Sequence, residues 1–331
     1  MFNRTTFGIL PDGTRIDILT LGSPGGLQMN VLTYGCIIQS LAVPSDHGHA
    51  VNVVLGFDRL EPYVNDSPYF GAVVGRYANR IANAQFAIHG REYRVTPNEP
   101  PNHLHGGVKG FDKRVWDAEA SGNGTSVVCR RRSPDGEEGY PGTLDVQVTY
   151  TLLQRELRVR YEATSDAATH VNLTQHSYFN LRGSGDVLDH RLAIHASTYL
   201  PVDERLIPTG ELAPVADTPF DFQQPTPIGS RIRSEHVQLT RGGGYDHNFN
   251  LNRTGEAFVL AAHVLEPSSG RTLDVRTSEP GLQFYSGQVI EYRGFCLEPQ
   301  HYPDSPNRPA FPKTLLQPGE RYESSTVYTF G

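Results

Sequence analysis

The chain has 331 residues, of which 20% are charged and 37% apolar, and its formal net charge is −7. This length allows one large β domain or two ordinary domains, and the composition is typical of a globular protein rather than a disordered one. The acidic balance argues against a nucleic-acid backbone as partner, because the one basic run, Arg130–Arg132, is too short to form a convincing patch.

Targeting signals and cysteine motifs are also missing from the sequence. Residues 1–7 lack the apolar segment of a signal peptide, and no apolar run approaches the ~18 residues of a membrane span. The three cysteines, Cys36, Cys129 and Cys296, are too widely spaced for a disulfide framework or a zinc motif. We therefore expect a cytoplasmic protein that binds neither nucleic acid nor membrane.

Apolar and polar residues alternate along most of the chain, which predicts half-buried strands. In chain order, we expect strands at 15–21, 27–34 and 51–56, a short helix at 60–67, a hairpin at 85–95, and strands at 116–120, 126–130, 144–152, 157–163, 170–175, 191–195, 256–265, 273–277 and 326–330. Short strands separated by turn residues, with no break in composition, predict an all-β sandwich or barrel in a single domain, residues 1–331.

Five short segments, in which polar side chains stand among glycines and aromatics, are candidates for chemistry. In the first, Gly75–Ile81, Asn79 and Arg80 offer fixed hydrogen-bond donors for hydroxyl groups. The alternative for Arg80 is an ordinary surface or ion-pairing role.

The second segment, Asn102–Gly107, contains His103 and His105, which share one face of an extended chain and so raise the possibility of a metal site. Lys109 stands where a cupin-like metal site would need a glutamate, which disfavours metal. His105 followed by two glycines equally suits a cleft where the backbone approaches a ligand closely.

The third segment, Asn172–Leu181, places His176 at the end of an alternating run, where histidine is the usual group for proton transfer near neutral pH. The alternative is a buried core histidine. In the fourth segment, Gly242–Phe249, Asp246 follows three glycines and can accept hydrogen bonds from ligand hydroxyls, or cap its own turn.

In the fifth segment, Glu279–Gly287, Gln283 stands among aromatics that can stack on an apolar ligand face or simply pack in a buried strand. Near the C-terminus, the segment Cys296–Asn307 predicts the end of a strand followed by a proline-rich loop. Glu298 at this exit is expected either to face a cleft whose rim the loop shapes, or to be a solvated surface residue.

The sequence has no nucleophile elbow, no P-loop and no dinucleotide fingerprint. What remains is one histidine and one or two carboxylates with amide, arginine and aromatic neighbours. That set of side chains suits a neutral, polyhydroxylated ligand and acid–base chemistry without a cofactor.

In combination and in order, these segments resemble the aldose 1-epimerase family. The resemblance is carried by Gly75–Ile81, Leu104–Gly107 with Gly110–Lys113, Asn172–Leu181, Tyr245–Phe249 and the Glu298 loop, and it runs from about residue 5 to the C-terminus. It implies a β-supersandwich and interconversion of the α and β anomers of aldohexoses such as galactose and glucose, without metal or nucleotide.

Position by position, the resemblance implies that Glu298 is the catalytic base and His176 the acid. It also implies that a sugar is bound by Asn79, Arg80, His105, Asp246 and Gln283. The implied partner is a small aldose, and the implied quaternary state is a monomer or homodimer. His103 and Tyr77 depart from the family pattern and are expected to alter the rim of the cleft.

Three other functions stay open on the sequence. A hexose-6-phosphate epimerase of the same fold would need added cations in the cleft. A retaining glycosidase would need two carboxylates about 5 Å apart, for which Asp246 and Glu298 are candidates. A sugar-binding protein without activity is the third, although the presence of both Glu298 and His176 argues against it.

Overall fold

The structure, a computed structural model, describes residues 2–23, 25–44 and 50–331. Residues 1, 24 and 45–49, which the expected domain 1–331 includes, lie outside the described residues. Among the helices of the described part, none has the length and apolar character needed to cross a membrane. The helices and 3-10 turns are α1 (Leu60–Asn65), α2 (Val237–Gly242), η1 (Ala82–Ala84), η2 (Phe111–Lys113), η3 (Glu137–Gly139), η4 (Ile228–Ser230), η5 (Gln288–Ile290) and η6 (Ser305–Asn307).

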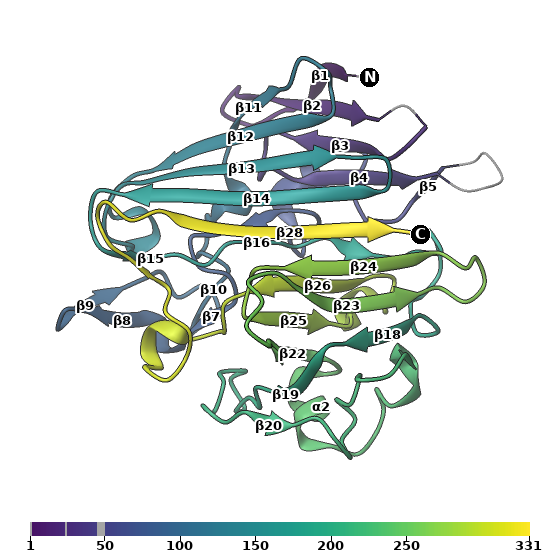
Figure 1. Ribbon diagram of the computed structural model, residues 1–331. Helices are drawn as coiled ribbons and strands as arrows, with labels where there is room; N and C mark the ends of the chain where they lie inside the picture. Colours follow the sequence, from purple (N-terminus) through teal and green to yellow (C-terminus); the bar gives the residue numbers. More distant parts are fainter. Residues whose placement is uncertain (1, 24, 45–49) are drawn as a thin grey trace.

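The largest sheet is antiparallel and has nine strands. In spatial order they are β11 (Asp117–Ala120), β12 (Ser126–Ser133), β13 (Leu144–Leu152), β14 (Glu156–Ser165), β28 (Tyr322–Phe330), β24 (Thr272–Thr277), β23 (Val259–Leu265), β18 (Arg191–Ile194) and β21 (Thr226–Pro227). Figure 1 shows β28, the yellow strand, between the teal strand β14 and the green strand β24. The strand that comes last in the sequence thus joins the two halves of the sheet.

Two smaller antiparallel sheets lie behind this one in Figure 1, the five-stranded sheet behind its upper half and the six-stranded sheet behind its lower half. The five-stranded sheet contains, in order, β1 (Phe2–Ile9), β2 (Arg15–Gly22), β3 (Gln28–Leu32), β4 (Ile38–Val43) and β5 (Val51–Asn52). The six-stranded sheet contains, in order, β17 (Tyr178–Phe179), β26 (Phe295–Gln300), β25 (Gly281–Tyr285), β22 (Asp246–Leu251), β19 (Ala196–Tyr199) and β20 (Ala213–Pro214).

Four two-stranded ribbons complete the described strands. They pair β6 (Val73–Val74) with β16 (Thr174–Gln175), β7 (Arg80–Ile81) with β10 (His103–Leu104), β8 (Gln85–Ile88) with β9 (Arg91–Arg94), and β15 (Thr169–His170) with β27 (Leu315–Leu316). The first two ribbons matter for function, because they hold segments that carry Arg80, His105 and His176.

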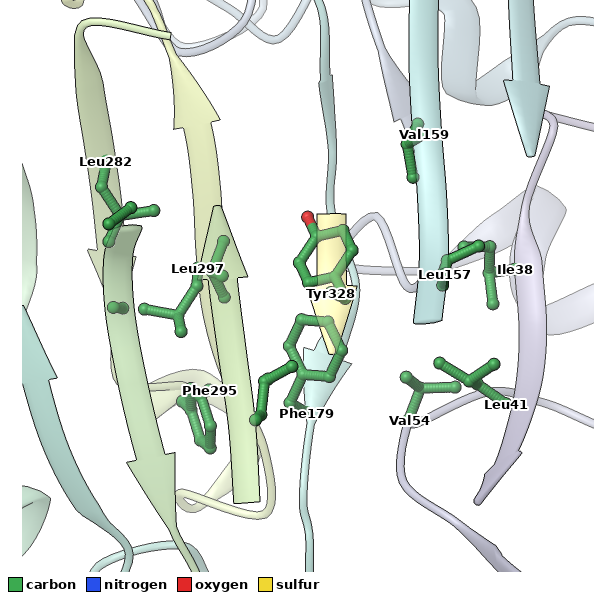
Figure 2. Packing of buried hydrophobic residues seen from close by; sticks show 14 of the residues in the cluster. Ile38, Leu41, Val54, Leu157, Val159, Phe179, Leu282, Phe295, Leu297 and Tyr328 are labelled. Carbon is green, nitrogen blue, oxygen red and sulfur yellow. The ribbon is translucent and has the colours of Figure 1, made fainter. Parts of the chain in front are cut away.

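One hydrophobic core joins the three large sheets, because the inward residues of their alternating strands pack against each other. Figure 2 shows Tyr328 of β28 and Phe179 of β17 between Leu297 of the six-stranded sheet and Leu41 of the five-stranded sheet. The Phe179 and Tyr328 ring centroids are 5.4 Å apart. The all-β architecture expected from the sequence is confirmed.

Two expected strands are wrong. Of 51–56, only Val51–Asn52 is a strand, and Val54 forms a single bridge with Phe179. The run 170–175 divides between β15 and β16, which pair with different partners, because the chain crosses from one ribbon to another at Asn172. Alternation over so few residues does not reveal which partner each half finds.

The η2 turn buries a carboxyl group close to the loop that carries His105. Asp112 is 7% exposed, and one of its oxygens, Oδ1, has no hydrogen-bond partner among the described residues. Burial raises the pKa of Asp112 from its ordinary value of 3.8 to about 7. The folded state therefore disfavours the charged carboxylate relative to the unfolded chain.

We expect Asp112→Asn to stabilise the protein at pH 8 by roughly 1–3 kcal/mol and to have little effect at pH 4. The group's raised pKa means that wild-type stability falls as pH rises from about 4 to 7, whereas asparagine cannot ionise. Urea unfolding at both pH values measures the difference, and an equal change in the free energy of unfolding at the two would contradict the prediction.

Candidate active site

A cavity of about 560 Å³ opens on the polar face of the six-stranded sheet. Residues from distant parts of the sequence form its wall. They are Pro68, Tyr69, Asn79, Arg80, Leu104, His105, His176, Tyr178, Leu206, Thr240, Arg241, Gly242, Gly243, Asp246, Tyr285, Gln288, Val289 and Glu298. Six of the seven site residues that the family resemblance implied therefore meet at one place, and Gln283 is the seventh.

Asn79 and His105 fix each other through reciprocal hydrogen bonds. The Asn79 N–H donates to His105 Nδ1 over 3.1 Å, and the His105 N–H donates to the Asn79 carbonyl oxygen over 3.1 Å. Both residues have left-handed φ angles, 64° and 51°, which non-glycine residues rarely adopt. Gly106 is required beside them, because its φ is +87° and a Cβ there would lie 1.8 Å from the Gly75 carbonyl oxygen.

His176 follows β16 and is 4% exposed. Its ring is stacked between Tyr178 and Tyr69, with centroid distances of 5.1 and 5.6 Å and interplanar angles of 26° and 25°. Cys296 Sγ lies 3.5 Å from its Nδ1. In the orientation that this packing holds, Nε2 of the imidazole points toward Glu298.

Glu298 lies within β26 rather than at a strand exit, and it is 2% exposed. Pro299 does not end the strand, because β17 pairs only with Phe295 and Cys296, so that edge of β26 needs no N–H at residue 299. The expectation that the following loop shapes the rim is also wrong. Asp304 in that loop instead binds the main chain of β7 and of Ala82.

Glu298 and His176 form a buried acid–base pair. His176 Nε2 is 3.7 Å from Glu298 Oε2. Burial, together with the nearby Asp246 carboxylate, holds the pKa of Glu298 well above its ordinary value. Burial lowers the pKa of His176 to about 4. Both pKa directions favour the state of the pair in which the carboxyl carries the proton and the imidazole is neutral.

Asp246 is oriented from two sides. Gln283 Nε2 donates to Asp246 Oδ1 over 2.6 Å, and Arg80 Nη1 lies 3.6 Å from Asp246 Oδ2. Arg80 itself donates twice to Glu99, from Nε over 2.6 Å and from Nη2 over 2.8 Å. Gln283 does not line the cavity, so it lies behind Asp246 rather than on the cavity surface.

The side chains of His105, His176 and Glu298 have potential metal-ligating atoms within 4.8 Å of one another. The hydrogen bond from the Asn79 N–H occupies the lone pair of His105 Nδ1, so the neutral ring carries its proton on Nε2. A metal would have to displace that proton or break that bond. The local geometry therefore fits His105 as a hydrogen-bond donor to a ligand better than as a metal ligand.

His103 and Tyr77, the two residues that depart from the family pattern, do not line the cavity. His103 is fully buried, with its Nδ1 2.7 Å from the Thr96 carbonyl oxygen and its Nε2 2.7 Å from the Tyr140 hydroxyl. Tyr77 is also fully buried and donates to the Tyr302 carbonyl oxygen over 2.9 Å. Both side chains stabilise the fold around the site, and the expected effect on the rim is wrong.

Several wall residues were not singled out from the sequence. Tyr69 and Tyr178 enclose His176, and α2 contributes Arg241 to the outer wall. Glu99, which accepts hydrogen bonds from Arg80, precedes Pro100–Pro101, and no pattern in the sequence around it indicates a function. Tyr178 alone had a signal, because it stands two residues after His176 in the third segment.

A buried carboxyl–imidazole pair beside other polar side chains, on a β-supersandwich, is the arrangement of a site for a small polar ligand. Residues 17–329 match the aldose 1-epimerase family model. The chain is 47% identical to human galactose mutarotase, across 99% of this chain and 98% of that one. It is 38% identical to aldose 1-epimerase of Escherichia coli, across 100% and 99% of the two chains.

Solved structures agree with the sequence matches. Galactose 1-epimerase from Lactobacillus acidophilus superposes with a TM-score of 0.89 at 30% identity, covering 100% of this chain and 98% of the other. An aldose epimerase homologue from C. elegans gives 0.88 at 29% identity, covering 95% and 98%. The chain belongs to the aldose 1-epimerase family, and it is an isomerase with the mutarotase activity on aldoses that defines this family.

We expect Glu99→Gln to raise KM for an aldose by up to roughly fivefold and to leave kcat nearly unchanged. The Arg80–Glu99 ion pair is partly exposed, so its contribution is of the order of 0.2–1 kcal/mol. Loss of this ion pair loosens Arg80 and leaves Glu298 and His176 unchanged. Polarimetric initial rates measure both constants. A drop in kcat at constant KM would contradict the prediction.

Proposed function

We propose that the enzyme interconverts the α and β anomers of free aldohexoses such as galactose and glucose, with Glu298 as base and His176 as acid. The observation that carries this proposal is the buried pair itself, with Nε2 and Oε2 3.7 Å apart on the wall of a cavity large enough for a hexose. The names of the relatives, galactose mutarotase and aldose 1-epimerase, agree with it.

Ring opening needs two proton transfers. Glu298 takes the proton from the C1 hydroxyl while His176 gives one to the ring oxygen, and the C1–O bond to the ring oxygen breaks to form the aldehyde. After rotation about the C1–C2 bond, closure on the other face of the carbonyl reverses both transfers. The enzyme finishes each turnover in its starting protonation state.

The total charge of the pair stays constant during this reaction. It begins as a Glu298 carboxylate with a His176 imidazolium, and at the aldehyde stage it is a carboxylic acid with a neutral imidazole. Both states have zero net charge, so neither leaves an unpaired charge in a dry site. The pKa directions favour the second state, and the Asp246 carboxylate, which raises the pKa of His176, supports the first.

Hydroxyl recognition falls to the remaining wall residues. Asn79, Arg80 and Asp246 offer polar atoms at the cavity surface, and His105 offers its Nε2–H. Gln283 acts on the sugar through Asp246, to which it donates a hydrogen bond. Tyr69 and Tyr178 keep His176 in place by stacking.

A hexose 6-phosphate is the alternative substrate, and the charges of the wall argue against it. The arginines among the described wall residues are Arg80 and Arg241. Arg80 binds Glu99, whereas Arg241 Nη1 donates to the Val202 carbonyl oxygen over 2.7 Å and its Nη2 lies 3.7 Å from Glu204. A phosphate would have to displace these partners.

The free cysteines and the shared core support two further proposals. Cys36, Cys129 and Cys296 are all buried thiols, which suits a reducing cytoplasm. One hydrophobic cluster extends through all three large sheets, which supports a single domain, residues 1–331. The proposed quaternary state is a monomer or homodimer.

Glu298→Gln and His176→Gln are each expected to lower kcat by roughly 10²–10⁴-fold with little change in KM, because each removes one proton transfer and keeps the shape of the site. Polarimetry on freshly dissolved α-galactose measures the rates, and calorimetry measures sugar binding. A wild-type rate in Glu298→Gln would overturn the role of this residue as base.

The matched control is His170→Gln. His170 is buried like His176, and burial lowers its pKa to about 4 as well, but it lies outside the cavity and its ring contacts Thr314. This variant is expected to keep wild-type kcat within a factor of about two. An equal loss in both histidine variants would point to general destabilisation instead of a catalytic role.

The same assay separates the two substrates. We expect kcat/KM for glucose to exceed that for glucose 6-phosphate by at least roughly tenfold, since the Asp246 carboxylate repels the added charge and both wall arginines already have protein partners. A preference for the phosphate would reject the proposed substrate while leaving the chemistry of the pair intact.

A further inference from the structure

Three amide side chains, those of Asn248, Gln283 and Gln300, share the polar face of the six-stranded sheet with Glu298. Asn248 of β22 is opposite Gln283 of β25, and Gln283 is opposite Glu298 of β26. Residues directly opposite in antiparallel strands share a face, so Asn248, Gln283 and Glu298 form one row across the sheet. Gln300 follows Glu298 by two residues and therefore lies on the same face.

This row is buried and poorly satisfied by the protein. Asn248 is 2% exposed and Gln300 fully buried, yet neither polar atom of either amide has a hydrogen-bond partner in the described part of the chain. Gln283 Oε1 and Glu298 Oε2 also lack one there. Unpaired buried polar atoms are costly, so their clustering in adjacent positions indicates a bound partner that satisfies them together.

Gly281 makes room within this group. It is the first residue of β25, opposite Gln300, and its backbone is not in the left-handed region. Glycine weakens a strand, so a reason other than backbone conformation is needed here. A Cβ at this position would lie 2.5 Å from Asn248 Oδ1. The missing side chain thus leaves space for the amide of Asn248 beside Gln300.

The chemistry of the group identifies its partner. Each amide offers both donors and acceptors, and water matches such a mixed set better than an ion of either sign. A sugar in the cavity is the other candidate, but Asn248 and Gln300 are not part of the cavity wall, whereas Glu298 is.

We propose that Asn248 and Gln300 are positioning residues that hold ordered water against Glu298 Oε2 and thereby keep this carboxyl group available as a base. The proposal rests on the proposed function, in which Glu298 takes the proton from the sugar. The water beside Glu298 donates to the anionic carboxylate and is held by Gln300, two residues along β26, while Asn248, two strands away, holds it through a further water; both amides therefore act on the reaction only through Glu298.

Hydrogen-bond donors beside Glu298 offset the electrostatic cost of a buried carboxylate. Burial and the Asp246 carboxylate both raise the pKa of Glu298, which works against a base that must be ionised when the sugar arrives. Hydrogen bonds to the charged form of a carboxyl lower its pKa. Loss of these donors should therefore move the protonation of Glu298 to higher pH without removing any group that touches the sugar.

The test is the pH dependence of kcat/KM in two near-isosteric variants, Asn248→Leu and Gln300→Met, measured by polarimetry between pH 4 and 9. We expect the acid limb of the profile to move upward by about one pH unit in each variant, with KM for galactose within about twofold of wild type. An unchanged acid limb would overturn the proposal. A large rise in KM with an unchanged limb would also overturn it, and would assign the amides to direct sugar binding.

The control is Gln39→Leu, which removes a buried amide of β4 that donates to the Phe57 carbonyl oxygen and accepts from Asn30, outside the site. It is expected to lower the melting temperature and leave the pH profile unchanged. A shifted acid limb in Gln39→Leu would mean that the shift comes from loosened packing, and would reject the specific role of Asn248 and Gln300.

The variant Glu298→Gln separates this proposal from the proposed function. If Glu298→Gln is inactive while the acid limbs of Asn248→Leu and Gln300→Met are unchanged, only the water-mediated role fails.

Discussion

The site depends on keeping a carboxyl and an imidazole together in a place that solvates neither charge. A buried pair that carries one shared proton meets this constraint, because moving the proton between Glu298 and His176 creates no net charge. Most other features of the site serve this arrangement. The stacked tyrosines fix the imidazole, β26 fixes the carboxyl, and the Glu99–Arg80–Asp246 chain sets the surrounding field.

The site is built from rigid strands and strained turns rather than from flexible loops. Glu298 of β26 and Asp246 of β22 lie in one sheet on either side of β25, so their spacing follows from sheet geometry. Asn79 and His105 both have left-handed conformations, and they are held by each other and by the single ribbon of β7 and β10. Such preorganisation suits the proposed reaction, in which two protons move at atoms close together on one sugar ring.

The sequence predicted which side chains meet at the cavity better than how each of them is positioned there. Polar residues among glycines pointed to Asn79, His105, His176 and Asp246, and alternation predicted the long strands, because both patterns are local. The position of Glu298 was misjudged because Pro299 signals a strand end, and only the pairing of β26 shows which edge is free.

Contacts between residues far apart in the sequence could not be predicted, because the sequence patterns are local. Nothing near Glu99 indicates that it binds Arg80, and nothing near Asn248 indicates that its amide lacks a protein partner. These features depend on which strands become neighbours, a property of the assembled sheets.

The central place of β28 has a consequence for how the molecule is made. During synthesis from the N-terminus, β14 and β24 leave the ribosome before the strand that must lie between them. Until then, each presents an open edge that can pair with another chain, and the two halves of the nine-stranded sheet have no common strand. The nascent protein therefore passes through a stage in which association with other chains competes with its own completion, and chaperone protection matters most at that moment.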